Sequence, residues 1–186
     1  ILTSELQQKI EKKIIAPLSG GLASEKIYYR GFLFLGIMVV KAEPYLLEFN
    51  CRMGDPETQP ILMRMKSDFL ELLLAATSEG LDQFELVWDR RVALGVVMAA
   101  AGYPMNPRKG DAIAGLPSDQ DEVMVFHAGT AQHDGKIVTS GGRVLCVTAM
   151  AESVRLAQHK AYSAVEPIAF DGMQWRKDIG YRALAQ

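Results

Sequence analysis

The feature that most constrains the fold of this sequence is a run of polar side chains at every second position, directly before a Gly-Asp-Pro sequence. Glu48, Asn50 and Arg52 alternate at the end of an apolar run. Because alternate side chains of a β-strand point to the same face, the spacing predicts a strand with one polar face. Residues 54–56, Gly-Asp-Pro, then end that strand.

These three side chains would suit phosphate chemistry. Carboxylate and amide oxygens are the ligands that Mg²⁺ prefers, and Mg²⁺ usually shares them with substrate phosphates. A guanidinium one pleat further can neutralise a transferring phosphoryl or acyl phosphate group. Spacing alone is nevertheless more typical of an ordinary polar strand face, with Arg52 paired to Asp55 or Glu57.

The N-terminal part of the chain is predicted to mix helices and strands. The pattern predicts, in order, helix 5–15, strand 27–40, turn 41–44, strand 45–50 and helix 61–79. Pro17 and Ser19-Gly20-Gly21 are expected to end the first helix. In the last helix, Asp68 could instead cap a second helix after a break.

After Gly80 the sequence becomes rich in short β-forming runs. Strands are predicted over 84–88, 92–101, 123–128, 136–139 and 143–149, followed by a helix over 152–164. Gly141-Gly142 is interpreted as a hairpin turn before the last of these strands. The whole is predicted to be an α+β chain of two domains, 1–82 and 83–186, the second an antiparallel sheet or small barrel.

Composition excludes several classes of function. The net charge of −2 in 186 residues leaves no basic surface for nucleic acid or for an anionic membrane. No apolar run approaches the ~20 residues that span a bilayer. Cys51 and Cys146 form no disulfide framework, so reduced thiols in a cytoplasm are expected. Since residue 1 is Ile, we expect the chain to start inside a longer protein.

Seven blocks of the chain together resemble one enzyme family. Residues 48–59, EFNCRMGDPETQ, are similar to the signature of phosphoribosylamine–glycine ligases, also called glycinamide ribonucleotide synthetases, of the ATP-grasp superfamily. Six further blocks resemble the family in the family's order: 29–40, 60–76, 94–104, 126–130, 140–149 and 176–183. The resemblance implies the C-terminal part of an ATP-grasp domain followed by a small β-rich C-terminal domain.

The family resemblance also implies a reaction. Members join 5-phosphoribosylamine to glycine in purine biosynthesis, with ATP going to ADP and phosphate through a glycyl phosphate. The expected small molecules are therefore phosphoribosylamine, glycine, ATP and Mg²⁺ or Mn²⁺. Nothing in the sequence resembles the family's N-terminal substrate domain or the half of the ATP-grasp unit with the nucleotide loop. We therefore expect a missing N-terminal half of the same enzyme, and no activity from this chain alone.

The resemblance assigns expected roles to particular residues. Glu48 and Asn50 would bind the metal that bridges the ATP phosphates, and Arg52 would stabilise the acyl phosphate. Asp55 could hold Arg52 or contact the amine substrates, and we treat it as a catalytic candidate. Leu35 or Ile37 could line the adenine pocket, although plain core packing is at least as compatible with them.

A second cluster lies near the C-terminus. Arg176, Lys177 and Arg182 are three cations within seven residues, which suits a phosphate monoester. The resemblance implies that Lys177 and Arg182 hold the 5′-phosphate of phosphoribosylamine, and we include Arg176 with them as substrate-binding. Asp178 is expected to orient one of these cations.

Two other functions remain compatible with the sequence. One is a different ATP-grasp carboxylate–amine ligase, which GDPETQ directly after EFNCR disfavours and which a substrate screen would identify. The other is a non-catalytic fragment used for assembly, which the absence of an upstream coding region for the missing half would support.

Overall fold

The computed structural model describes residues 2–118 and 120–184. Their contacts divide the chain into two compact units. The first comprises residues 2–54 and 69–84, and the second comprises 55–68 and the rest of the described chain from 85. The predicted domains, 1–82 and 83–186, stay a prediction. In the part of the chain that is described, no helix is long and apolar enough to cross a membrane.

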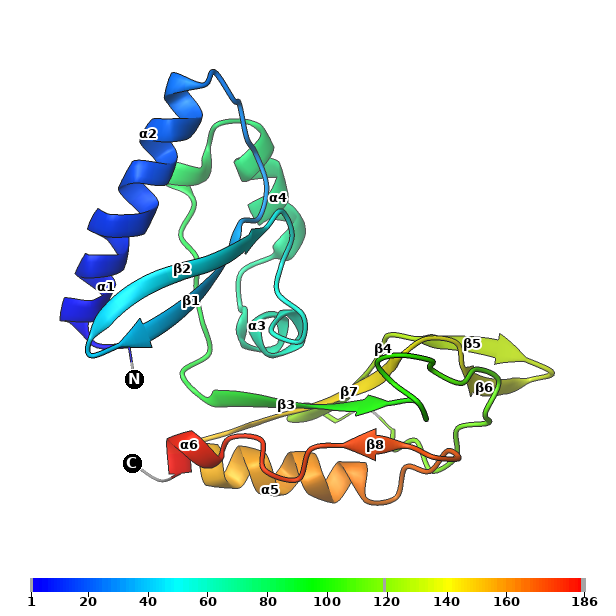
Figure 1. The fold of residues 1–186 in the computed structure, drawn as a ribbon. Coiled ribbons are helices and arrows are strands. Elements are labelled where there is room, and N and C mark those ends of the chain that lie inside the picture. The colour runs from blue at the N-terminus through cyan, green and yellow to red at the C-terminus, as the bar shows by residue number, and fades with distance from the viewer. Residues whose placement is uncertain (1, 119, 185–186) are drawn as a thin grey trace. The chain divides into compact units, whose positions relative to one another are not determined.

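The first unit begins with one continuous helical segment (Figure 1). It comprises α1 (Ser4–Ile10), a π-helical stretch η1 (Glu11–Ile15) and α2 (Ala16–Ser24). The predicted stop at Pro17 and the glycine pair is wrong. Pro17 directly follows the π-helical stretch, where the Ala16 N–H bonds to the Glu11 carbonyl five residues back, so the missing Pro17 N–H falls at a local irregularity of the helix. Glycine weakens a helix without ending it. Thr3 caps α1 by accepting a hydrogen bond from the Leu6 N–H at 3.2 Å.

Strands β1 (Phe34–Val40) and β2 (Glu43–Asn50) of the first unit form an antiparallel hairpin. The turn is Lys41-Ala42, and both residues have positive φ angles, as a two-residue hairpin turn of type I′ requires. The predicted turn over 41–44 was therefore two residues too long, and the predicted strand from 27 began too early. A bulge between Gly36 and Ile37 offsets the register so that Gly36 lies opposite Glu48.

Two helices stand where the sequence favoured one over 61–79. Helix α3 (Thr58–Arg64) belongs to the second unit and α4 (Phe69–Thr77) to the first. The alternative of a second helix starting after Asp68 is confirmed. In the first unit, Phe69 stacks on Phe32 with ring centroids 6.0 Å apart, and a short 3₁₀ helix η2 (Leu81–Gln83) follows.

The second unit is built on an open antiparallel sheet in the order β4-β7-β3-β8. Its strands are β3 (Val92–Ala99), β4 (Val123–His127), β7 (Arg143–Ala151) and β8 (Gln174–Trp175). A separate two-stranded sheet pairs β5 (Thr130–His133) with β6 (Lys136–Thr139). The described strands form no closed barrel, so of the two predicted forms the antiparallel sheet is the one found.

Several details of the sequence interpretation differ from this sheet. Residues 84–88 form no strand, and only one bridge, Met65 to Trp88, touches them. Strand β5 was missed because its sequence, TAQH, has little apolar character. Gly141-Gly142 is no hairpin turn, because β6 pairs with β5 whereas β7 pairs with β3 and β4.

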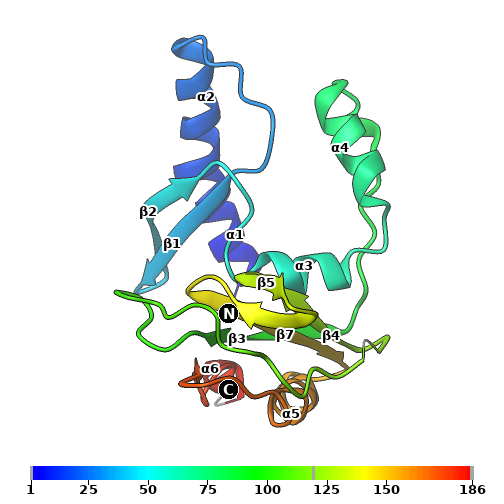
Figure 2. The ribbon, with the colours of Figure 1, turned by 90° about the vertical axis from the view of Figure 1, so that its right-hand side faces the viewer.

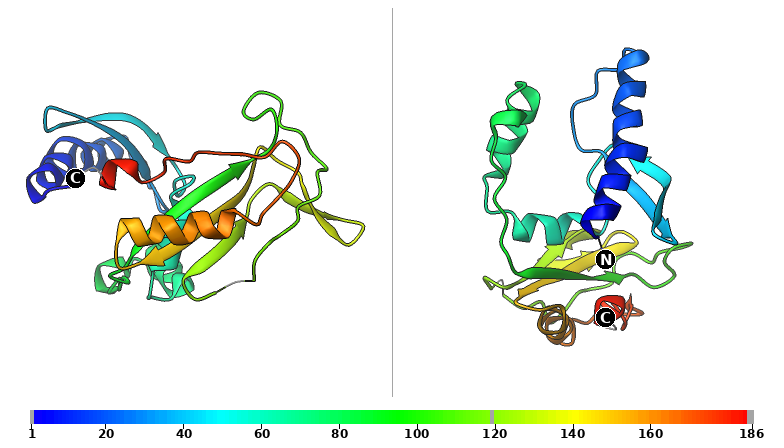
Figure 3. Two further views of the ribbon diagram at one scale, coloured as in Figure 1. Left: turned by 90° about the horizontal axis from the view of Figure 1, so that it is seen from below. Right: turned by 90° about the vertical axis from the view of Figure 1, so that its left-hand side faces the viewer.

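Helix α5 (Val154–Val165) covers one face of the sheet, as Figures 2 and 3 show. Its alanines Ala157 and Ala161 are fully buried, which lets the helix backbone approach β3 and β7 closely. Every second residue of β3 faces this core. The last described element is the short helix α6 (Tyr181–Leu184). The opposite face of β3 carries small residues, and the site described below lies there.

A glycine pair offers a test of this packing. Gly115 and Gly135 have nearly equal φ angles, +71° and +73°, but a Cβ on Gly115 would lie 1.8 Å from the Pro167 carbonyl oxygen, whereas Gly135 has open space. Gly135→Ala should cost about 1 kcal/mol from backbone strain alone. Gly115→Ala should cost clearly more in the free energy of unfolding, measured by denaturant titration. Equal losses would show that the Pro167 contact is not tight.

Candidate functional site

The polar end of β2 carries the first group of candidate residues. The Glu48 side chain crosses towards β1, where its Cγ lies 2.8 Å from the position that a Cβ on Gly36 would occupy. Only glycine therefore leaves room for this carboxylate. Within residues 2–118 and 120–184 the Glu48 carboxylate has no hydrogen bond or ion pair.

Asn50 is the last residue of β2, so Arg52 lies beyond the strand, but the two side chains contact each other. The Arg52 Nη2 donates to the Asn50 side-chain oxygen at 3.2 Å, and its Nη1 donates to the Met53 carbonyl at 2.9 Å. The guanidinium is thus held against the oxygen that was predicted to bind a metal. That oxygen keeps one further lone pair for a cation.

Leu35, Ile37 and Glu48 come together around one cavity of about 590 Å³ in the first unit. An apolar wall beside an acidic group is what a nucleotide base and its metal-bound phosphates require. The oxygens of Glu48 and Asn50 fit a hard cation. The Glu48 carboxylate has no partner among the described residues, and Gly36 leaves room for it. The described residues contain no cluster of three or more His, Cys, Asp or Glu that could hold a metal, so the remaining ligands would have to come from phosphates and water.

Asp55, in the second unit, is paired with an arginine that the sequence did not single out. The Arg143 Nη1 lies 2.7 Å from the Asp55 carboxylate and also donates to the Asp55 carbonyl at 3.0 Å. The Arg143 Nε donates to the Tyr103 hydroxyl at 2.9 Å, and these hydrogen bonds raise the pKa of Arg143. Arg143 is 88 residues from Asp55, so no local sequence signal could reveal the pair.

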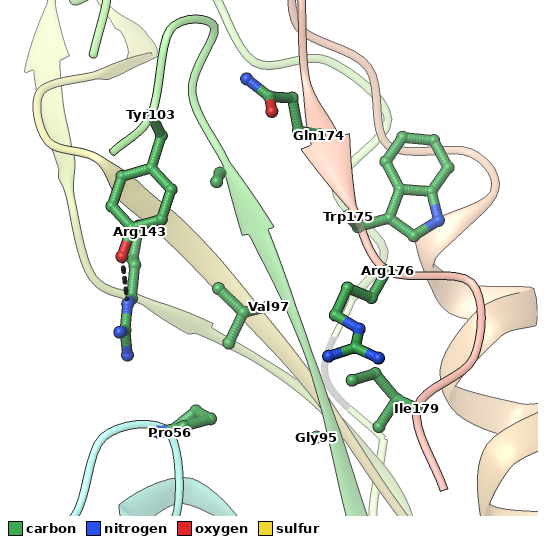
Figure 4. Close-up of a pocket in the computed structure, with 10 residues that line it drawn as sticks. Pro56, Gly95, Val97, Tyr103, Arg143, Gln174, Trp175, Arg176 and Ile179 are labelled. Atoms are coloured by element: carbon green, nitrogen blue, oxygen red, sulfur yellow. Dashed lines mark hydrogen bonds between the residues drawn. The ribbon is translucent and has the colours of Figure 1, made fainter. Parts of the chain in front are cut away.

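Arg143 and Arg176 line a second cavity, of about 550 Å³ (Figure 4). Its floor is formed by Gly95, Val97 and Ala99, the residues of β3 that face away from α5. Pro56, Tyr103, Gln174, Trp175 and Ile179 complete the lining. In Figure 4 the two arginines lie on either side of Val97.

The three predicted phosphate-binding cations do not converge. Arg176 reaches this cavity, but Lys177 lines a different one beside α5, and the Arg182 guanidinium stacks on the Tyr181 ring at 5.6 Å. Asp178 accepts two hydrogen bonds from Arg176, at 2.9 and 2.7 Å, which confirms that it orients a cation. The substrate-binding roles of Arg176, Lys177 and Arg182 stay a prediction.

The Arg176 pair makes the titration of Asp178 informative. Hydrogen bonds from Arg176 lower the pKa of Asp178 below its usual value of about 4. The ionised pair is therefore complete above that usual value and is lost only as the pH falls through the lower folded-state pKa. An NMR titration of the Asp178 carboxyl carbon should show a midpoint below about 4, which rises towards that value in Arg176→Gln. Arg155→Gln, an exposed arginine on α5, is the control. Equal midpoints in all three proteins would contradict the pairing.

Two family models match successive parts of the chain. "Phosphoribosylglycinamide synthetase, ATP-grasp (A) domain" matches residues 1–58, and "Phosphoribosylglycinamide synthetase, C domain" matches residues 93–182. Curated relatives are similar over nearly the whole chain. A phosphoribosylamine–glycine ligase of Ralstonia nicotianae is 53% identical over 99% of this chain, and that of Haemophilus influenzae is 50% identical over 99%.

Solved structures agree in fold. A phosphoribosylamine–glycine ligase from Thermotoga maritima superposes on 96% of the chain with a TM-score of 0.86 and 40% identity. The biotin carboxylase domain of Hydrogenobacter thermophilus 2-oxoglutarate carboxylase, in complex with MgADP and bicarbonate, matches at a TM-score of 0.62 and 16% identity, which shows the fold alone.

The chain spans less than half the length of these ligases, 44% of the Ralstonia and Thermotoga proteins. Its matches nevertheless extend from one end of the chain to the other and point to a single family. The chain therefore belongs to the phosphoribosylglycinamide synthetase family and comprises parts of its ATP-grasp domain and its C domain.

Proposed function

We propose that this chain supplies part of the active site of a phosphoribosylamine–glycine ligase. The reaction joins 5-phosphoribosylamine to glycine with conversion of ATP to ADP and phosphate, in purine biosynthesis. The observation that carries the proposal is the cavity lined by Glu48, Leu35 and Ile37, where the Glu48 carboxylate has no partner among the described residues. Curated relatives of that name align with nearly the whole chain.

Glu48 and Asn50 would hold a divalent cation, Mg²⁺ or Mn²⁺, both of which accept oxygen ligands. The bound cation would neutralise charge on the ATP phosphates. Leu35 and Ile37 would contact the adenine. Arg52, which is already held by the Asn50 oxygen and the Met53 carbonyl, would face the developing charge of the acyl phosphate. A guanidinium positioned before the reaction stabilises that charge without reorganisation.

Asp55 would act through Arg143 instead of touching the reacting atoms. The amine of phosphoribosylamine would displace phosphate from glycyl phosphate to form the amide. Of the predicted cations Arg176, Lys177 and Arg182, Arg176 is the proposed contact for its 5′-phosphate, because of these three it is the one that lines the second cavity. The partners would be these small molecules and the N-terminal half of the same enzyme. The free thiols of Cys51 and Cys146 support a cytoplasmic location.

Replacing Glu48 tests the metal role directly. In the full-length protein that contains this chain, Glu48→Gln should lower kcat for ATP- and glycine-dependent amide formation by about 100-fold or more. It should also weaken metal-dependent binding of ADP, measured by calorimetry, because a neutral amide attracts the cation less. Gly36→Ala should act in the same direction, since the new methyl group occupies the space of the Glu48 side chain.

The matched control is Glu25→Gln, which removes an exposed carboxylate of the same unit outside the cavity. Unchanged turnover and unchanged metal dependence in Glu48→Gln would refute the proposed ligand. A screen of amino acids and amines with the wild-type protein would separate this ligase from other ATP-grasp carboxylate–amine ligases, which would prefer another pair of substrates.

The isolated 186-residue chain should form no product from ATP, glycine and phosphoribosylamine. The reason is that the curated relatives are more than twice as long as the chain, so their active sites can include residues that this chain does not have. The measurement is a coupled assay of ADP release with and without glycine. Glycine-dependent turnover by the isolated chain would contradict the expectation.

A further inference from the structure

The cavity between Arg143 and Arg176 combines two cations with an apolar floor, and its shape is already set by protein contacts. Arg143 is the better fixed of the two. Its Nε and Nη1 bind Tyr103 and Asp55, and its guanidinium lies 6.0 Å from the centre of the Tyr103 ring. Its Nη2 has no acceptor among the residues that the structure describes, so this nitrogen is available to a ligand.

The backbone beside Arg143 leaves no room for a side chain larger than glycine at positions 129 and 142. A Cβ on Gly142 would lie 2.5 Å from the Tyr103 ring, and one on Gly129 would lie 2.6 Å from the Arg143 carbonyl oxygen. The glycines therefore allow the start of β7 to fit tightly against the Tyr103 loop. Arg143 enters the cavity from a rigid strand end, which is the placement that a binding residue needs.

Arg176 is held differently, by one carboxylate. Its Nε and Nη2 donate to Asp178, and its Nη1 has no acceptor within the described part of the chain. Its side chain is 69% exposed, so it can adjust to a ligand. Each arginine thus combines an anchoring carboxylate with one nitrogen that has no acceptor among the described residues.

The chemistry of the lining narrows the class of ligand. Two guanidiniums suit a doubly charged phosphate monoester better than a single carboxylate. The floor of Gly95, Val97 and Ala99 offers contact to the C–H face of a sugar. A volume of about 550 Å³ is ample for a phosphorylated pentose and far larger than glycine requires.

We propose that Arg143 is a substrate-binding residue, which together with Arg176 binds the phosphate of a phosphorylated pentose in this cavity. The assignment rests on the proposed function for the identity of the sugar and adds a residue that the C-terminal cluster of cations does not contain. Asp55 is then a positioning residue, because it holds the Arg143 fork in place. Lys177 and Arg182 lie outside this cavity.

Binding of ribose 5-phosphate to the 186-residue chain, measured by calorimetry and by NMR, tests the proposal. Saturable binding at about millimolar concentration is expected. Arg143→Gln and Arg176→Gln should each weaken it by roughly tenfold or more, because each removes a charge-assisted hydrogen bond. Asp55→Asn should weaken it less. Arg155→Gln, which makes the same charge change on α5, should leave the affinity unchanged.

Several outcomes would overturn the proposal. These are no saturable binding, full affinity in both Arg143→Gln and Arg176→Gln, or loss of binding in Lys177→Gln with full affinity in Arg143→Gln. Inorganic phosphate bound as tightly as ribose 5-phosphate would mean an adventitious ion only. If the thermal midpoint shows that Arg143→Gln is unfolded, the affinity of Arg176→Gln decides the result, because Arg176 is exposed and its replacement should not affect folding. Binding needs neither ATP nor turnover, so the site and the ligase activity can fail independently.

Discussion

The pairing of β3 with β7 is the contact on which the second unit depends. Eight residues of β3 pair antiparallel with β7, and α5 buries one face of the pair. On that side Val96, Met98 and Val147 are completely buried. Each such apolar side chain contributes roughly 1.5–3 kcal/mol, which makes this the strongest region of the unit. The other face is thereby free to carry small residues and a cavity.

Because side chains alternate along a strand, the sequence of β3 serves both the core and the cavity. The even-numbered positions of β3 fill the core under α5, while Gly95, Val97 and Ala99 form the floor of the cavity. Strand β7 begins at Arg143, at the edge of that floor. A rigid sheet therefore sets where this guanidinium lies, and the hydrogen bonds to Asp55 and Tyr103 set how it is oriented.

In the first unit the β1–β2 hairpin plays the corresponding part. Its bulge places Gly36 opposite Glu48, and the missing side chain gives the carboxylate its space. The alternation of Glu48 and Asn50 along β2 could be predicted from sequence, since the period of a strand is a local property. The bulge could not, because a shift in register depends on the partner strand.

Among the predicted helices and strands, too, those set by local sequence were found correctly and those set by distant contacts were not. Strand β6 was predicted to the residue and helix α5 nearly so, because apolar periodicity is a local signal. Pro17 and the glycine pair misled, since continued helical contacts on both sides outweigh a weak local signal. Strand β5 has almost no apolar residues, and its pairing with β6 alone makes it a strand.

Sequence by itself determined the family, the polar face of β2 and the expectation that Asp178 orients a neighbouring cation, because each rests on residues that are close along the chain. Only the tertiary structure revealed Arg143 as the partner of Asp55 and Tyr103, 88 and 40 residues away, and separated Lys177 from Arg176. Adjacent cations look equivalent in a sequence. Arg176 and Lys177 directly follow β8, and the pairing of β8 with β3 brings Arg176 to the cavity while Lys177 lines another one.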